Sequence, residues 1–390
     1  MDQRALLRRI SIALILLLTP GCPGPEEAAP RETVRSKNGV RNGAQTYFTT
    51  TEDGWKIALH RVKPDSPRAD LVPVILCHGL GYNNRFWRLD DEHNFAHHLA
   101  DAGFDTWGVD LRGGGDSTKP VWRVLRMPEI GPGELSRLRV ASQDWSADEC
   151  IRYDVPAAID LVCKETGSKK VAWVGHSLGG MIMFGHLSQT GDERVLCFAS
   201  VAAPMFIPRP TNNILRDIRG FRLLMMMVNN RWQALAGAAT LSRLKTPIDM
   251  LFYNTDNVDV PVIMELFLHA TEDIPSGMIE QTLALAKTGE FISSDGKINY
   301  TEEARRVDVP ILMLAGKADN MADPEGVRYI YHRVSSKDKT FRLFGLANGN
   351  ACDYGHDDLI IGKHAPQEVF PFLRDWLNRT ARMPSGSPPK

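Results

Sequence analysis

Short apolar runs alternate with helix-like stretches along most of the chain, and this alternation limits the fold more than any other feature. Five runs contain few polar side chains: residues 71–77, 106–109, 171–174, 195–201 and 310–315. Uniformly apolar strands of this length are typical of a parallel sheet that is covered on both faces. Residues 47–48 and 55–62 predict an antiparallel pair of strands before them. The sequence therefore predicts an α/β fold with a mostly parallel, doubly wound sheet.

Length and charge limit the classes of protein further. The chain has 390 residues, which suits one large α/β domain with an insertion. Its 46 Lys and Arg against 47 Asp and Glu give a net charge of -1, so no overall field attracts the phosphates of a nucleic acid. The six cysteines form no CxxC pair and no Cys/His spacing for tetrahedral zinc. We therefore expect no nucleic-acid partner, no metal and no cofactor.

Residues 1–22 have the layout of an export signal. Arg8 and Arg9 precede an apolar run at residues 10–18, and Gly21-Cys22 follows it. The run is shorter than the ~20 residues that span a bilayer, which disfavours a permanent transmembrane helix. Cys22 resembles the site at which a bacterial lipoprotein is cleaved and lipidated, and ordinary cleaved export is the alternative. We predict an exported protein that is anchored to a membrane only through Cys22, or is otherwise periplasmic or secreted.

The pattern also divides the rest of the chain. Residues 23–44 are rich in Pro, Glu, Arg and Asn and predict a flexible linker. Residues 45–203 and 307–378 carry the predicted strands and form two parts of one core. Residues 204–306 show helical patterning and are too many for a simple crossover, so we predict a helical cap inserted into the core. Residues 379–390 predict a disordered tail.

The sequence Gly175-His-Ser177-Leu-Gly179 lies between a predicted buried strand and an apolar, helix-like run. A sharp strand-to-helix turn leaves no room for side chains at the two glycines and raises the serine hydroxyl above the sheet. The N–H of Leu178, at the start of the helix, would face the carbonyl group under attack. We predict Ser177 as a nucleophile and Leu178 as an oxyanion donor. The alternative is a glycine-rich turn in which the serine only caps a helix.

A serine of ordinary pKa needs a base and a third group that orients the base. In folds with this turn, an acid and then a histidine follow the serine along the chain. A last strand is predicted near residues 341–344, and the loop after it contains His356, which we predict as the base, with His364 in reserve. Asp319 is the first acidic residue after the fifth apolar run and is the predicted acid. Asp323 is placed to cap the next helix.

The loop after the first apolar run, His78-Gly-Leu80-Gly, predicts a second oxyanion donor. Its first glycine lets the backbone come close to the serine, and we assign the donor to the N–H of Leu80. His78 is expected to be hydrogen-bonded within this loop. Cys77 and Cys352 lie near the loops of the site, but no neighbouring group in the sequence would lower a thiol pKa, so we interpret both as buried apolar residues.

Several stretches resemble the acid lipases, the family of α/β hydrolases to which gastric and lysosomal acid lipases belong. They are residues 145–160 running into 175–179, residues 99–107 with Arg112-Gly113, residues 319–324, and residues 355–360 with 365–369. The resemblance covers about residues 45–203 and 307–378. It implies the α/β-hydrolase fold, a triad of Ser177, Asp319 and His356, oxyanion donors at Leu80 and Leu178, and hydrolysis of ester or lipid-like substrates.

Two other functions share parts of this pattern. An acyltransferase would carry the same triad and differ only by keeping water out of the second step. A non-catalytic binding protein of this fold usually lacks one member of the triad, and all three residue types are present here. Dehalogenases and epoxide hydrolases need Asp at the position of Ser177. We therefore expect a serine esterase or lipase that acts through an acyl-enzyme.

Two stretches of the predicted cap, residues 221–228 and 260–268, are rich in Met, Leu and Phe. Such side chains adapt to flexible acyl chains, although packing of the cap onto the core explains most of them better. If the cap is a lid over an apolar pocket, replacing Met225, Met226 and Met227 with Ala shifts the preference for ester chain length and leaves Ser177 reactive. A p-nitrophenyl ester series together with fluorophosphonate labelling measures both. An unchanged chain-length preference contradicts the lid.

Overall fold

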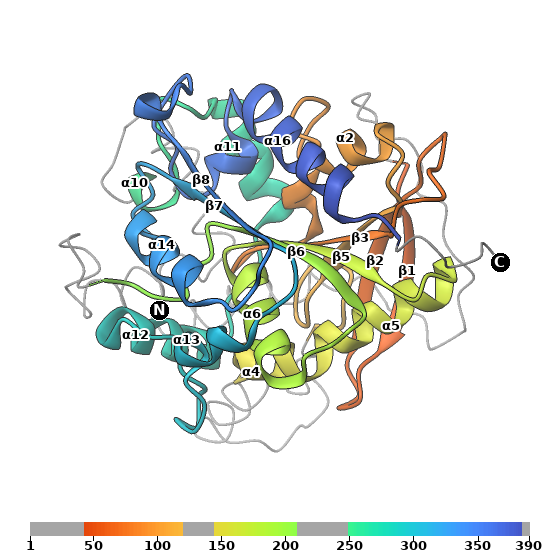
Figure 1. Cartoon of the computed structure of the whole chain (residues 1–390), viewed down its shortest axis with the longest axis horizontal. Coiled ribbons are helices and arrows are strands. Elements are labelled where there is room, and N and C mark those ends of the chain that lie inside the picture. The colour runs from red at the N-terminus through yellow and green to blue at the C-terminus, as the bar shows by residue number, and fades with distance from the viewer. Residues whose placement is uncertain (1–42, 120–143, 209–248, 384–390) are drawn as a thin grey trace, which may run out of the picture. The chain divides into compact units, whose positions relative to one another are not determined.

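The computed structural model describes residues 43–119, 144–208 and 249–383. These residues contain an 8-stranded sheet in the order β1-β2-β4-β3-β5-β6-β7-β8 (Figure 1). The strands are β1 (Gln45–Thr50), β2 (Lys56–Val62), β3 (Val74–Cys77), β4 (Thr106–Asp110), β5 (Val171–His176), β6 (Val195–Val201), β7 (Ile311–Gly316) and β8 (Lys339–Phe344). The pairs β1/β2 and β2/β4 are antiparallel, and the other five are parallel. The predicted fold class is confirmed.

The central strands are as deeply buried as their composition predicts. Every residue of β3, β4, β5 and β7 is buried, so each strand contributes apolar side chains to both faces of the sheet. Strand β3 begins at Val74 and not at Leu71 as predicted. Leu71 instead forms an isolated bridge with Arg382, and Pro73 has no N–H to donate to a ladder. The apolar run is therefore longer than the strand.

Helices cover the sheet on both faces. Helices α2 (Phe95–Asp101) and α16 (Ala365–Thr380) contact each other on one face, and α5 (Val155–Thr166) and α6 (Leu178–Thr190) contact each other on the other (Figure 1). The other described α-helices of the core are α4 (Ala147–Glu149), α14 (Pro324–Arg333) and α15 (Asp358–Ile361). The core also contains the 3-10 helices η1 (Asn84–Trp87) and η6 (Leu346–Asn348) and the π-helical segment η3 (Cys150–Asp154).

Between β6 and β7 the described residues contain several short helices joined by loops. The elements are α10 (Asp249–Phe252), α11 (Val260–Glu265), η4 (Leu266–Ala270), α12 (Ser276–Thr288), α13 (Tyr300–Glu303) and η5 (Ala304–Arg306). The predicted export signal, residues 23–42 of the predicted linker, and Met225 to Met227 lie outside the described residues. Among the described helices, none combines the length and the apolar character that crossing a membrane requires.

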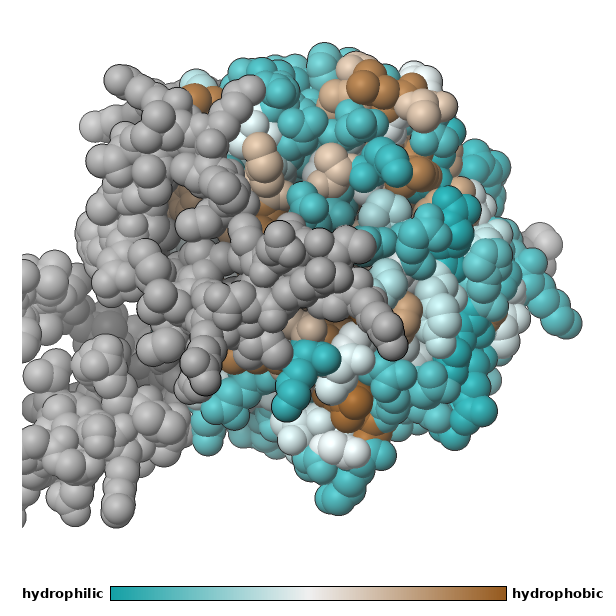
Figure 2. Space-filling model, turned by 90° about the vertical axis from the view of Figure 1, so that its left-hand side faces the viewer, coloured by the Kyte–Doolittle hydropathy of each residue, from teal (hydrophilic) through white to brown (hydrophobic). Residues whose placement is uncertain are grey.

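The described surface carries large apolar side chains only in scattered positions. Figure 2 shows one face, on which small apolar areas lie among mainly hydrophilic residues. The large apolar residues that are exposed in the described ranges are Phe48, Met250, Val260, Leu268, Tyr329 and Leu346. Single exposed apolar residues are ordinary on a protein surface, so these positions do not by themselves indicate a docking site.

Candidate active site

Ser177 occupies a strained turn between β5 and α6. Its φ is +51°, a left-handed value that only one other non-glycine residue, Ala202, adopts among the described residues. The N–H of Ser177 donates to the carbonyl of Val201, and its own carbonyl accepts from the N–H groups of Gly180 and Met181. These bonds hold the serine in a conformation that is costly for an L-residue. Strain of this kind is expected at a nucleophile on a strand-to-helix turn.

The glycines on either side of Ser177 are required by close backbone contacts. A Cβ at Gly175 would lie 2.3 Å from the carbonyl oxygen of Gly179. A Cβ at Gly179 would in turn lie 2.3 Å from the carbonyl oxygen of Cys77, at the end of the neighbouring strand β3. Any side chain at either position would therefore force β3, β5 and α6 apart.

The three side chains predicted as a triad lie within hydrogen-bonding distance of one another. The Nε2 atom of His356 is 2.9 Å from the Oγ atom of Ser177. The Nδ1 atom of the same ring is 2.9 Å from Oδ2 of Asp319. All three residues are buried, and they follow β5, β7 and β8 in the chain. The carboxyl ends of these parallel strands lie at one edge of the sheet, which brings together residues that are distant in sequence.

Backbone N–H groups of the two residues at positions 321 and 322 hold the side chain of Asp319 in place. Its Oδ1 accepts hydrogen bonds from the N–H groups of Met321, at 2.8 Å, and Ala322, at 2.7 Å. Burial lowers the pKa of His356, but the charge and hydrogen bond of Asp319, together with the charges of Asp357 and Asp358, raise it more, so the net pKa lies above the ordinary value for histidine. The ring is therefore a stronger base than a free imidazole, and Asp319 fixes it with Nδ1 protonated and Nε2 toward the serine.

The two predicted oxyanion donors face one pocket. Leu80 and Leu178 line it together with Gly79, Trp145 and Met278. Within the described ranges, the N–H groups of Leu80 and Leu178 donate to no other group. Leu178 is the first residue of α6, where backbone N–H groups have no partner inside the helix. Both N–H groups thus remain without an acceptor among the described residues, as the predicted role requires.

His78 orders the loop that carries Leu80, as expected. Its Nδ1 donates to the carbonyl of Gly79 at 2.8 Å, and its Nε2 accepts from the N–H of Leu111 at 3.3 Å. Because both of its ring nitrogens are hydrogen-bonded to backbone groups, His78 connects this loop to the residue that follows β4. Burial lowers the pKa of His78, which favours the neutral ring that this pattern needs.

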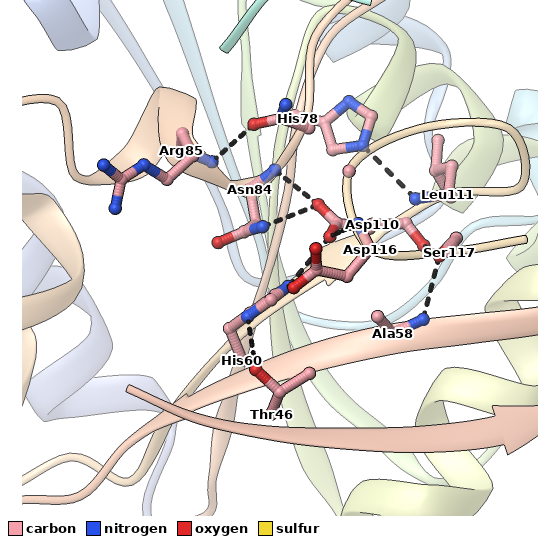
Figure 3. A network of polar contacts seen from close by, with 12 residues as sticks. Thr46, Ala58, His60, His78, Asn84, Arg85, Asp110, Leu111, Asp116 and Ser117 are labelled. Atoms are coloured by element: carbon pink, nitrogen blue, oxygen red, sulfur yellow. Dashed lines mark hydrogen bonds and ion pairs between the residues drawn. The ribbon is translucent and has the colours of Figure 1, made fainter. Parts of the chain in front are cut away.

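A buried hydrogen-bond network around Asp110 also holds the loops near His78 in place (Figure 3). Oδ1 of Asp110 accepts from the backbone N–H and the side-chain amide of Asn84, both at 2.7 Å. Oδ2 accepts from Nε2 of His60 at 2.8 Å and from the N–H of Asp116 at 2.9 Å. Burial alone would raise the pKa of Asp110, but these donors hold it well below the ordinary value. The network therefore fixes η1 and the loop after β4 to the core.

The structure also brings together residues that the sequence analysis did not single out. The phenol of Tyr82 donates to Oδ2 of Asp357 at 2.7 Å, which links the Leu80 loop to the loop of His356. His176, the residue before the serine, donates from Nε2 to the carbonyl of His356 at 3.2 Å. Asp358 accepts from the N–H of Gly355 at 2.8 Å. The only sequence signal for these contacts is the unusual His-Asp-Asp run, and burial of the two carboxylates could not be read from it.

The remaining candidates have structural surroundings. His364 lies directly before α16, and the Nε2 atom near Ser177 belongs to His356. Asp323 caps α14 as predicted, because its side chain accepts from the N–H of Glu325. Cys77 is buried as predicted, whereas Cys352 is only partly buried. Burial raises the pKa of both thiols, that of Cys352 to about 12, so neither is prepared for nucleophilic chemistry.

Two clusters in the described ranges have spacings that a metal ion could bridge. They are His176 with His356 and Asp357, and His60 with Asp110 and Asp116. In the first cluster, both ring nitrogens of His356 are already engaged by Ser177 and Asp319. In the second, His60 and Asp110 are joined directly at 2.8 Å. Hydrogen bonds therefore account for the positions of the side chains in both clusters.

Comparison with known proteins agrees with this geometry. The family model described as alpha/beta hydrolase fold matches residues 72–347. This chain belongs to that family. A Caenorhabditis elegans protein named lipase lipl-1 is 32% identical over 84% of this chain and 86% of its own length. Gastric triacylglycerol lipase of Rattus norvegicus is 26% identical over 84% of this chain and 86% of that protein. The resemblance to acid lipases is confirmed, and these relatives support the predicted enzyme class, a carboxylic ester hydrolase.

Solved structures show the same fold at low sequence identity. An esterase from Exiguobacterium antarcticum is 16% identical and covers 85% of this chain and 98% of its own, with a TM-score of 0.54. A thermophilic esterase from Thermogutta terrifontis is 17% identical and covers 87% of this chain and 100% of its own, with a TM-score of 0.52. Their agreement with this chain is in the fold.

The Asp110 network yields a prediction about stability. Replacing Asp110 with Ala leaves His60 and the two donors of Asn84 without their acceptor inside the protein. We expect the free energy of unfolding to fall by about 3–5 kcal/mol, as when one partner of a buried charge pair is removed. Urea unfolding followed by tryptophan fluorescence measures the loss.

Asp116 provides the matched control within the same cluster. Its side chain is 64% exposed and lies 3.8 Å from Nε2 of His60. Asp116→Ala keeps the N–H that Asp110 accepts and should cost less than about 1 kcal/mol. Equal losses for the two variants would contradict the role given to Asp110.

Proposed function

We propose that the chain is a serine hydrolase that cleaves carboxylic esters through an acyl-enzyme on Ser177, with His356 as the base and Asp319 as the acid of a triad. The observation that carries this proposal is the pair of 2.9 Å contacts that joins Ser177 to His356 and His356 to Asp319. A serine hydroxyl beside a basic, oriented imidazole is the arrangement that nucleophilic catalysis needs. The lipase relatives support the same reaction class.

In the first half of the reaction, Oγ of Ser177 attacks the ester carbonyl carbon while Nε2 of His356 takes the hydroxyl proton. The carbonyl π electrons move to oxygen, and the N–H groups of Leu80 and Leu178 donate to that oxyanion. When the carbonyl re-forms, the bond to the alcohol oxygen breaks, and His356 gives its proton to that oxygen. The alcohol leaves, and the acyl group stays on Ser177.

The second half repeats these steps with water. His356 takes a proton from water, and the hydroxide oxygen attacks the acyl carbon. The bond to Oγ then breaks, and Ser177 regains a proton from His356 as the carboxylic acid leaves. Asp319 keeps its charge throughout and stabilises the imidazolium that forms twice in each cycle. The elevated pKa of His356 favours that imidazolium.

We further propose that the substrates are apolar or lipid-like esters and that residues 204–306 form a cap between the two parts of the core. Support for the substrate class comes from relatives named as lipases, among them a triacylglycerol lipase. The net charge of -1 suits a neutral substrate. Part of the cap serves packing, because Val262, Ile263 and Leu266 are buried.

Labelling with a fluorophosphonate tests the triad directly. The parent chain should be labelled and should hydrolyse p-nitrophenyl esters. In Ser177→Ala, labelling should vanish and kcat should fall by about 10⁴-fold or more, because the acyl-enzyme cannot form. In His356→Ala, kcat should fall by a similar factor.

Gln189→Ala is a control for the substitution itself, since this exposed residue lies near the far end of α6. It should be labelled like the parent. Labelling that survives Ser177→Ala would overturn the proposed nucleophile. Transfer of the acyl group to an added alcohol in place of water would favour the acyltransferase.

We also propose that the chain is exported and anchored through a lipid on Cys22. Support comes from the arginines, the apolar run and the Gly21-Cys22 pair of the first 22 residues. In a bacterial host, the parent chain should then partition into the detergent phase of a Triton X-114 extract and incorporate labelled palmitate.

Cys22→Ala should lose the palmitate label and should not enter the detergent phase as a mature lipoprotein. Cys163→Ala, which removes another thiol, should retain both properties. An unlabelled but processed parent chain would favour ordinary cleaved export.

A further inference from the structure

Asp357 is a buried carboxylate that the proposed reaction does not use. It directly follows His356 in the chain, and its side chain is fully buried. Oδ2 accepts the hydrogen bond from Tyr82, whereas Oδ1 has no hydrogen-bond partner within the described residues. A buried carboxylate oxygen without a donor is costly when the group is ionised. This position therefore calls for a physical explanation.

The unpartnered oxygen lies near His176, and the carboxylate of Asp357 lies near the proposed base. Oδ1 of Asp357 is 3.7 Å from Nε2 of His176, which itself donates to the carbonyl of His356. One ring nitrogen of His176, one of His356 and one carboxylate oxygen of Asp357 all lie within 4.8 Å of one another. At such a separation inside the protein, a charge on Asp357 acts strongly on His356.

Among the described residues, no lysine or arginine forms an ion pair with Asp357. The ionisable groups that face it from the surrounding elements are Tyr82, His176, Tyr253, Asp319, His356 and Asp358. Burial lowers the pKa of His176 well below its ordinary value, so this ring stays neutral. Burial has the opposite effect on a carboxyl group, and it raises the pKa of Asp357 to about 7. Asp357 therefore changes its charge near neutral pH.

We propose that Asp357 is a positioning residue for His356, which it ties to the oxyanion loop through Tyr82, and that its ionised carboxylate stabilises the protonated form of that base. This inference rests on the proposed function, because it concerns the base of that reaction. It assigns to Asp357 a role distinct from that of Asp319, which orients the ring through Nδ1. It also differs from that of Asp358, whose oxygens are engaged by Gly355, Asn254 and Asn257.

The inference has a consequence for the pH at which the enzyme works. Protonated His356 cannot accept the serine proton, so kcat/KM falls on the acid side as this ring is protonated. An ionised Asp357 favours protonation and moves that fall toward higher pH. A neutral Asp357 does not. Because the two groups interact, the acid limb reports an apparent pKa that belongs to the pair.

Asp357→Asn tests the charge while keeping an oxygen that can accept from Tyr82. The acid limb of kcat/KM for p-nitrophenyl butyrate should move toward lower pH by about one unit, since removing an opposite charge at this distance shifts a pKa by that order. Relative to the plateau, kcat/KM on the acid limb should rise by up to about tenfold. Tyr82→Phe removes the donor that favours ionised Asp357 and should shift the limb in the same direction by less.

Asp323→Asn is the matched control, because it removes a carboxylate near Asp319 and keeps a side chain that can cap α14. Its acid limb should coincide with that of the parent chain. An unchanged limb in Asp357→Asn would overturn the inference, as would an equal shift in the control. Should Asp357→Asn fail to fold, the limb of Tyr82→Phe decides the question.

Thermal unfolding gives a second readout. The pKa of folded Asp357, about 7, lies above its unfolded value of about 4, so the stability linked to its protonation is fully present below about pH 4 and is lost as pH rises from about 4 to about 7. The fall in Tm between about pH 4 and about pH 7 should therefore be smaller in Asp357→Asn than in the parent chain. An equal fall would overturn the inference. Ser177→Ala separates this from the proposed function, which fails only if labelling survives that substitution.

Discussion

The left-handed turn at Ser177 is the constraint on which the rest of the site depends. A φ of +51° at a serine costs of the order of 1–3 kcal/mol and persists only where the surroundings enforce it. Close backbone packing holds the turn here, because Gly179 lies so near Cys77 that no Cβ fits between them. That contact sets the spacing of β3, β5 and α6. It therefore also places the loop of Leu80 beside the start of α6, where Leu178 offers its N–H.

Buried carboxylates help to hold the loops around this turn. Asp110 fixes η1 through Asn84, and Arg112 joins Asp154, at 2.9 Å, to Asp53, at 2.7 Å. These bonds connect the turn between β1 and β2 with the loop after β4 and with η3. A carboxylate with several donors fixes both the position and the direction of the groups that bond to it. Each ionised group is costly to bury, and the donors around it offset that cost.

The sequence predicts those features whose signal is local. The five apolar runs predict β3 to β7, because a strand that is buried on both faces is apolar along most of its length. The strand, the glycine pair and the helix around Ser177 are adjacent in the chain, so their spacing can be read directly. The roles of Asp357 and Asp358 cannot be read in this way. Which of two neighbouring carboxylates is fully hydrogen-bonded depends on Tyr82 and Asn257, which lie far away in sequence and meet them only in the fold.

Hydrogen bonds to the loops of the site limit which part of the predicted cap could move as a lid. The described segment before α11 is bonded to the histidine loop, since the N–H of Asp357 donates to Phe252 and Asn257 donates to Asp358. The segment after η4 is bonded to the oxyanion loop, through the N–H of Glu272 and the carbonyl of Gly81. Displacing either segment would break buried hydrogen bonds to the loops that carry the proposed base and oxyanion donor. These two segments are therefore fixed parts of the site. One is hydrogen-bonded to the loop of His356, and the other is hydrogen-bonded to the loop of Leu80.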